Sequence, residues 1–196
     1  MFFIFQKQLH ATNCIGISRF SDQHACHDLY KAAQKFISHH FEELSDNEEF
    51  CLLEHNELAD ILKKDELVVA GEESVFDALH SWVNYDPNKR QGYMAKLLHC
   101  IRLPLMTLKY LRHLHDSNPF IQQSSSCQDQ VKKALNYHLR PNERIQAAKE
   151  MGSKTKVRGE AKMLCAVGGK NGLFATLNRL VLPCCSTACY TSNDTM

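Results

Sequence analysis

The fold of this chain is decided by residues 50–111, which read FCLLEHNELADILKKDELVVAGEESVFDALHSWVNYDPNKRQGYMAKLLHCIRLPLMTLKYL. Apolar residues recur in this stretch every three or four positions, the spacing that gives a helix one buried face. The pattern predicts a series of helices, over residues 56–62, 74–84 and 89–99 and from Pro104 onward. These helices are too short to be stable alone, so they are expected to pack against one another.

Acidic residues and prolines mark where these helices begin and end. Glu72 and Glu73 stand just before 74–84, where acidic side chains complement the positive end of the helix dipole. Pro87 ends that helix, because a proline forces the residue before it out of the helical region. Pro104 suits the first turn of the next helix, where its missing N–H is harmless.

The helical spacing continues on both sides of this stretch. Residues 26–44 carry one apolar stripe and residues 126–138 carry another. Ser45 and Glu48 are spaced as in a capping box, which predicts a short helix through Phe50. The predicted fold is therefore an all-α array of antiparallel helices joined by short loops. The side chains expected in its core are Phe36, Phe41, Leu58, Leu62, Val75, Phe76, Leu79, Trp82, Leu97, Leu98, Ile101 and Leu105.

The composition of the chain changes after Arg140. Residues 141–162 contain few large apolar side chains and many charged ones, which predicts a solvated linker. In residues 163–177, two apolar runs flank the pair Gly168-Gly169 and a polar turn, which predicts a short β-hairpin. Residues 178–196 are expected to form an unstructured tail.

The overall composition excludes several classes of protein. The chain has 196 residues, of which 44% are hydrophobic and 23% charged, with a formal net charge of +1. This balance gives no basic footprint for nucleic acid. No segment approaches the ~18 consecutive apolar residues of a membrane span, and the opening MFFIF does not have the pattern of a signal peptide. We therefore expect a cytoplasmic protein with no membrane or nucleic-acid partner.

The cysteines and histidines predict neither disulfides nor a metal site. The nine cysteines are odd in number, and none are spaced as C-x-x-C. His24, Cys26 and His27 lie close in sequence but point to different sides of a helix. The densest thiol group is read as oxidation-prone tail cysteines, Cys184, Cys185 and Cys189. No cofactor is expected, and no nucleophile or acid–base set indicates an enzyme.

The spaced positions of residues 50–111 resemble the BACK domain of the kelch-like proteins. The resemblance places a BACK domain over 8–140, including the helical pair that follows a BTB domain, after a divergent N-terminus at 1–7. It makes 163–177 a partial first kelch repeat, with the glycine pair at the end of its first strand. The residues that carry the BACK resemblance are Leu53, Leu58, Ile61, Leu62, Asp65, Leu67, Val69, Glu72, Glu73, Val75, Phe76, Ala78, Trp82, Arg90, Leu97, Leu98 and Ile101 to Met106.

The resemblance implies a substrate adaptor of a cullin-RING ubiquitin ligase, acting in protein ubiquitination and proteasomal degradation. In the family, the helices after the BTB domain help to bind a cullin of the cullin-three type. Because this sequence has no counterpart of the BTB domain and of most of the propeller, we expect a truncated isoform. The candidates for protein interaction, expected on an exposed apolar surface, are Leu9, Cys14, Ile15, Ile17 and Phe20.

Two alternatives stay open. In the first, the fragment uses this apolar surface to associate with full-length relatives and interferes with them. In the second, it is a cytoskeletal, actin-associated scaffold, as some kelch-like relatives are. Ubiquitination that depends on the chain would favour the adaptor, dominant interference the first alternative, and co-sedimentation with filaments the second.

Overall fold

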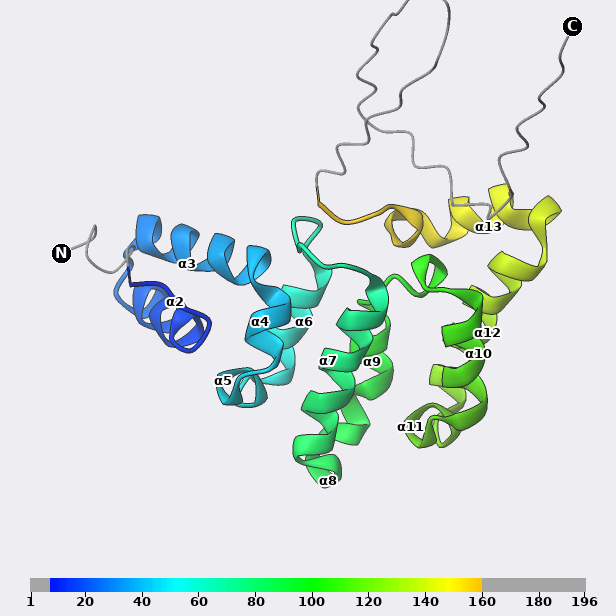
Figure 1. Cartoon of the computed structure of the whole chain (residues 1–196), viewed down its shortest axis with the longest axis horizontal. Helices are drawn as coiled ribbons and strands as arrows, with labels where there is room; N and C mark the ends of the chain where they lie inside the picture. Colours follow the sequence, from blue (N-terminus) through cyan, green and yellow to red (C-terminus); the bar gives the residue numbers. More distant parts are fainter. Residues whose placement is uncertain (1–7, 160–196) are drawn as a thin grey trace, which may run out of the picture. The chain divides into compact units, whose positions relative to one another are not determined.

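The structure, a computed structural model, describes residues 8–159 (Figure 1). Within this range the chain forms helices and no strand, so the all-α prediction is confirmed. All the described residues belong to one compact unit. The predicted hairpin with Gly168 and Gly169, and the predicted tail, lie outside the described residues.

The helices follow one another with short connections. Those before Pro87 are α2 (Cys14–Gln23), α3 (His27–His39), α4 (Phe41–Ser45), α5 (Glu48–Cys51), α6 (His55–Lys63) and α7 (Glu72–Tyr85). The next are α8 (Pro87–Arg90), η1 (Gln91–Tyr93), α9 (Met94–Leu98), η2 (Leu103–Leu105), α10 (Leu108–Ser117) and α11 (Pro119–Gln122), where η marks a 3-10 helix. The last are α12 (Ser125–Leu139), η3 (Pro141–Glu143), α13 (Arg144–Met151) and η4 (Gly152–Thr155).

The helices pack in sequence order around α7 and α12. α7 contacts α4, α5 and α9, and α9 in turn contacts α6 and α12. α12 then contacts α10, α11 and α13. Figure 1 shows α7 beside α9 and α12 beside α10. The longer helices α7 and α12 therefore bury their apolar faces against their neighbours in the array.

Two predicted helices are broken in the structure. The stripe over 26–44 is divided between α3 and α4, because the backbone at His40 leaves the helical region with φ −115° and ψ 33°. Residues 89–99 form the end of α8, then η1 and α9. Pro104 lies in the separate turn η2, and α10 begins anew after Thr107, whose side chain accepts a hydrogen bond from the N–H of Tyr110 at 3.3 Å.

The predicted capping box at Ser45 is wrong. Ser45 ends α4, and its hydroxyl donates to the carbonyl of Glu42 at 2.8 Å. The capping box of this fold lies instead at the start of α6, where the side chain of Glu57 accepts from the N–H of Glu54 at 2.9 Å. The short helix predicted through Phe50 forms as α5, but its N-cap residue is Asn47 and not Ser45.

The core runs through the whole array. Trp82 is 2% exposed, and its indole N–H donates to the carbonyl of Leu53 at 2.9 Å. Phe36 is half-buried and packs against the core, and Leu105 is also half-buried. The other side chains expected in the core are buried: Phe41, Leu58, Leu62, Val75, Phe76, Leu79, Leu97, Leu98 and Ile101.

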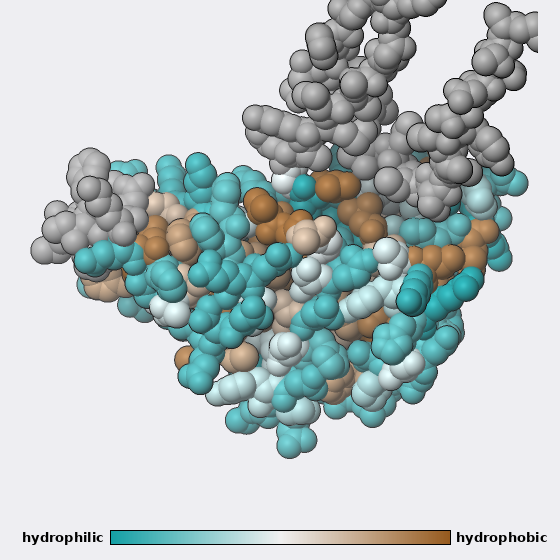
Figure 2. Space-filling view, in the orientation of Figure 1, coloured by the Kyte–Doolittle hydropathy of each residue, from teal (hydrophilic) through white to brown (hydrophobic). Residues whose placement is uncertain are grey.

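The surface carries scattered apolar side chains. The face in Figure 2 is mostly hydrophilic and is interrupted by hydrophobic residues. Such scatter is normal for a protein surface, so a docking site needs further evidence. The large apolar residues that are exposed are Phe20, Leu52, Val68, Tyr85, Tyr93, Leu139, Ile145 and Val157.

Candidate protein-interaction site

The residues predicted to mediate protein interaction lie on α2 or just before it. Phe20 is 47% exposed, Leu9 and Ile17 are half-buried, and Cys14 and Ile15 are buried. The expectation that Ile15 lies on an exposed surface is therefore wrong. α3 packs against α2, and the core covers the apolar face of this helix. The role of these residues in binding stays a prediction.

The outer face of α2 is tied to α6 by Arg19. Its Nε and Nη2 atoms donate to the two carboxylate oxygens of Glu57 at 2.8 and 2.6 Å. Nη2 also lies 3.3 Å from the carbonyl oxygen of Leu52. The Arg19 hydrogen bonds lower the pKa of Glu57, because they favour the charged carboxylate. A bidentate charged contact thus lies next to the exposed Phe20.

A buried ion pair lies at the start of α7, where the sequence predicted only a favourable helix dipole. Glu72 is 4% exposed and accepts from Arg158, with Nε 2.6 Å from Oε1 and Nη2 3.2 Å from Oε2. The backbone N–H of Arg102 also donates to Oε2 at 3.0 Å. The carboxylate therefore bonds to two segments that are distant in sequence.

Arg158 also donates to three backbone carbonyls. Its Nη1 atom lies 2.6 Å from the oxygen of Leu62 and 2.9 Å from that of Lys64, and its Nη2 atom lies 3.2 Å from that of Cys100. Carbonyls at the ends of helices lack partners inside the helix, so such donors are needed there. One guanidinium thus joins the ends of α6 and α9 to the start of α7.

We call residues 152–159 the strap. Besides Arg158, it bonds to the helical array through the carbonyl of Lys156, 2.6 Å from Nη1 of Arg102, and through the N–H of Gly159, 2.7 Å from the carbonyl of Asp65. Nη2 of Arg102 bonds to the Asp65 carboxylate. The strap is therefore held to the loops that follow α6 and α9.

The expectation of a solvated basic segment is wrong at Arg158, which is 6% exposed. Helix α13 (Arg144–Met151) also forms inside this segment. Periodicity could not identify Arg158, because its acceptors come from residues that are remote in sequence. A basic side chain in a polar stretch is usually solvated, and only the tertiary contacts bury this one.

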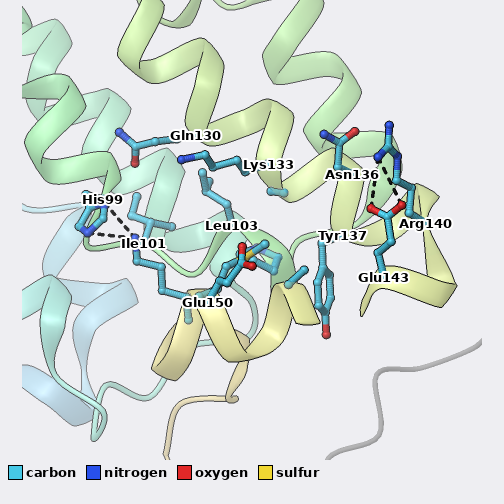
Figure 3. A pocket seen from close by; sticks show the side chains of 15 residues that line it. His99, Ile101, Leu103, Gln130, Lys133, Asn136, Tyr137, Arg140, Glu143 and Glu150 are labelled. Atoms are coloured by element: carbon cyan, nitrogen blue, oxygen red, sulfur yellow. Dashed lines mark hydrogen bonds and ion pairs between the residues drawn. The ribbon is translucent and has the colours of Figure 1, made fainter. Parts of the chain in front are cut away.

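A pocket of about 450 Å³ lies between α12, α13 and the segment 99–104 (Figure 3). Ile101, Leu103 and Tyr137 are among its buried lining residues, and they give it an apolar floor. The volume lies in the ordinary range of ligand pockets. The strap completes the pocket, since Lys154 belongs to its lining.

The charges around this pocket are unevenly distributed. At one end Lys154 Nζ lies 2.9 Å from Nδ1 of His99, and Lys133 lies on the same side (Figure 3). Burial, Lys154 and Lys133 lower the pKa of His99, and burial with Lys133 lowers that of Lys154. At the other end Arg140 pairs with Glu143, with Nη1 and Oε2 3.2 Å apart. The exposed carboxylate of Glu150 lies between these two ends (Figure 3) and accepts a hydrogen bond from the side-chain amide of Gln146 at 3.2 Å. The Lys154 end is therefore electropositive, the Arg140 end is neutralised, and Glu150 adds one negative charge to the lining between them.

Metal-ligand clusters and membrane-spanning helices are both absent from residues 8–159. Across residues 8–159, His, Cys, Asp and Glu side chains do not form a group of three that could bind a metal ion. None of the helices in that range is long and apolar enough to cross a membrane.

Comparison with known proteins places this helical array in a family. The model of the family described as "BACK: BTB And C-terminal Kelch" matches residues 14–116, from the start of α2 to the last turn of α10. The chain belongs to the kelch-like family, through its BACK domain. The match ends before α12, α13 and the strap, so the pocket draws most of its lining from residues beyond the matched range.

The relatives of this kelch-like chain extend the similarity past the BACK domain. It is 46% identical over 173 residues to Kelch-like protein 28 of Mus musculus and 45% identical over the same length to Kelch-like protein 28 of Homo sapiens. Each alignment covers 88% of this chain. The chain spans about 30% of the length of these relatives.

Proposed function

We propose that this chain is a non-enzymatic, adaptor-type protein of a cullin-RING ubiquitin ligase, acting in the cytoplasm. The proposal rests on the membership of the kelch-like family and on the 45–46% identity to Kelch-like protein 28. The BACK domain is the spacer and interaction module of this adaptor. The cullin of the cullin-three type is its proposed scaffold partner.

The adaptor acts by position. It raises the effective concentration of a bound substrate near the ubiquitin carrier, so none of its own residues needs to be catalytic. A spacer must be rigid to do this. The bonds from Arg158 to Glu72 and to three helix-end carbonyls support that role, because they fix the strap to the helices that precede it.

The test is binding of a purified cullin N-terminal domain to the whole chain. A monomeric fraction from size-exclusion chromatography is immobilised, so that aggregates do not contribute. We expect retention at micromolar concentrations, and we expect Phe20→Asp to weaken it. Tyr85→Asp is the matched control, since Tyr85 is 60% exposed and lies on α7, away from α2 in sequence. If the unmodified chain retained no cullin, the proposed partner would be wrong.

A second candidate function is association with full-length kelch-like proteins, followed by interference with them. The exposure of Phe20 and Leu52 favours this second function. The carbonyl of Leu52 accepts a hydrogen bond from Arg19, the residue that precedes Phe20. Exposed apolar side chains such as these are the residues through which that association would take place. Co-elution of the chain with a full-length relative, together with reduced ubiquitination by that relative, would support interference over the adaptor role.

A further inference from the structure

The electropositive end of the pocket has two cations and a histidine close together. Lys154 donates to the ring of His99, with distances of 2.9 Å to Nδ1 and 3.2 Å to Nε2. Lys133 is near enough to lower the pKa of both other groups. Within the described range, no carboxylate forms an ion pair with any of the three. The two positive charges of Lys133 and Lys154, held close together, attract an anion.

The rest of the pocket is suited to an apolar group. Its floor includes Ile101 at 1% exposure, Leu103 at 4% and Ala134 at 1%, with Pro104 and Tyr137 also buried. An apolar floor with a few convergent polar groups at one end is the usual composition of a binding pocket. The ligand that fits both features has a negative charge next to a large apolar group.

The length of the pocket favours an extended chain over a small acid. Its wall runs along α12 from Gln130 to Arg140, the residue that follows the helix. At about 1.5 Å per residue these ten steps span roughly 15 Å. An extended peptide covers about 3.3 Å per residue, so four or five residues fit along this wall. The backbone carbonyls and amides of such a peptide also have partners in the exposed side chains of the rim, for example Asn136.

We propose that this pocket binds a short peptide segment of a partner protein that carries a carboxylate next to an aromatic side chain. The carboxylate lies against Lys133 and Lys154, and the aromatic ring lies on the floor at Leu103 and Tyr137. The Arg140–Glu143 pair gives the far end no net charge, and the carboxylate of Glu150 repels an acidic group from the middle of the pocket. The two lysines therefore determine which end of the pocket the carboxylate of the peptide occupies. This proposal does not depend on binding to a cullin.

The test uses the whole chain and the C-terminally amidated peptide Gly-Asp-Phe-Glu-Gly, labelled at its N-terminus with an uncharged fluorophore, and binding is followed by fluorescence anisotropy. We expect saturable binding, and we expect Lys133→Glu and Lys154→Glu each to weaken it about tenfold or more, since a charge-assisted contact is removed and a repulsive one added. Lys132→Glu is the matched control, because it makes the same change on the same helix at a residue that is exposed and outside the pocket lining.

Further arms separate this ligand from others. The amide peptide Gly-Asn-Phe-Gln-Gly is expected to bind at least tenfold more weakly, and 3-phenylpropanoate is expected to displace the acidic peptide only at far higher concentration. The proposal is overturned by equal binding of the amide peptide, by an equal loss in Lys132→Glu, or by no binding up to millimolar concentration. Displacement by 3-phenylpropanoate at the same concentration as the unlabelled peptide would make this a site for small aromatic acids and would also overturn it. Thermal melts of each variant establish that the fold is retained.

Discussion

Arg158 bonds to Glu72 across 86 residues of sequence, with Nε 2.6 Å from Oε1. Their side chains are 2% and 4% exposed. Burying either charge alone is costly, so each side chain needs the other. The pair therefore makes the strap part of the folded array.

The first prediction concerns this pair. Arg158→Ala leaves the carboxylate of Glu72 buried, and of the contacts described above it keeps only the hydrogen bond from the N–H of Arg102. Breaking a buried pair on one side costs about 3–5 kcal/mol. The free energy of unfolding, measured by urea denaturation, should fall by that amount.

The control for the first prediction is Arg140→Ala. Arg140 pairs with Glu143 at 3.2 Å, but both side chains are exposed. An exposed pair is worth about 1 kcal/mol or less. If both variants shifted the urea midpoint equally, the Arg158 contact would have no special role in stability.

The second prediction concerns Trp82. Trp82→Ala removes a buried ring, its hydrogen bond to Leu53 and the contact with Arg90, whose guanidinium carbon lies 4.3 Å from the ring centroid. Cavity formation of this kind costs about 3–5 kcal/mol. We expect a clearly lower melting temperature and loss of much of the helical signal in circular dichroism near that temperature.

Tyr85→Ala is the matched comparison for Trp82. Tyr85 lies on the same helix, also contacts Arg90, and is 60% exposed. Its removal should cost about 1 kcal/mol or less. A Trp82→Ala protein that melted within a degree or two of the parent would contradict the central position of Trp82 in the core.

The sequence predicts the elements of this fold that depend on local signals. The apolar stripe around Trp82 and the break at Pro87 determine α7 through residues that are near in sequence. The ends of the helices are harder to predict. Glu54 and Thr107 are the N-cap residues of α6 and α10, and the sequence pattern predicts other starting positions for these two helices. Local periodicity therefore finds the helices better than it finds their ends.

The sequence does not predict the contacts that close the site. The sequence predicts that Ile15 is exposed, but Ile15 is buried in α2, which packs against α3. From the sequence, Glu72 is expected only to complement the helix dipole, and Arg158 is expected only to be a solvated basic residue. The pocket requires Lys133 and Lys154 to come together from α12 and the strap, which no local pattern can show.

The third prediction concerns thiol reactivity. Burial, together with the negative charge of Glu49, raises the pKa of Cys14 to about 11. At pH 8, Cys14 is then a thiolate in on the order of one molecule in a thousand, and the thiol is also inaccessible to solvent. Cys26, in contrast, is exposed. In the native protein, iodoacetamide should modify Cys26 early and Cys14 only after urea is added.

Peptide mass mapping at timed intervals measures this difference. Cys127 is also buried, and burial raises its pKa, so it should follow Cys14. The same reaction in urea is the control, since the rates at these cysteines should then become similar. Native Cys14 reacting as fast as Cys26 would contradict the packing of α2 against the core.

The fourth prediction concerns the pH dependence of the Arg19–Glu57 contact. The hydrogen bonds from Arg19 lower the pKa of Glu57 in the folded chain, while an unfolded glutamate titrates near ~4.3. A lowered folded pKa means that ionisation of Glu57 favours the fold. Its contribution is complete at neutral pH and is lost as the pH falls through the folded pKa. Both side chains are partly exposed, at 42% and 36%, so solvent screening keeps this effect small.

The measurement compares the urea midpoints of the parent and of Glu57→Gln between pH 7 and pH 4. Glu57→Gln should be less stable at pH 7, and the difference should shrink as the pH falls, because the parent carboxylate becomes protonated. Glu66→Gln is the control, since Glu66 is exposed, and its difference should stay near zero at each pH. A Glu57→Gln deficit that stayed constant or grew toward pH 4 would mean that the Arg19 contact is not what favours the charged form of Glu57. The tie between α2 and α6 would then have to come from their apolar packing.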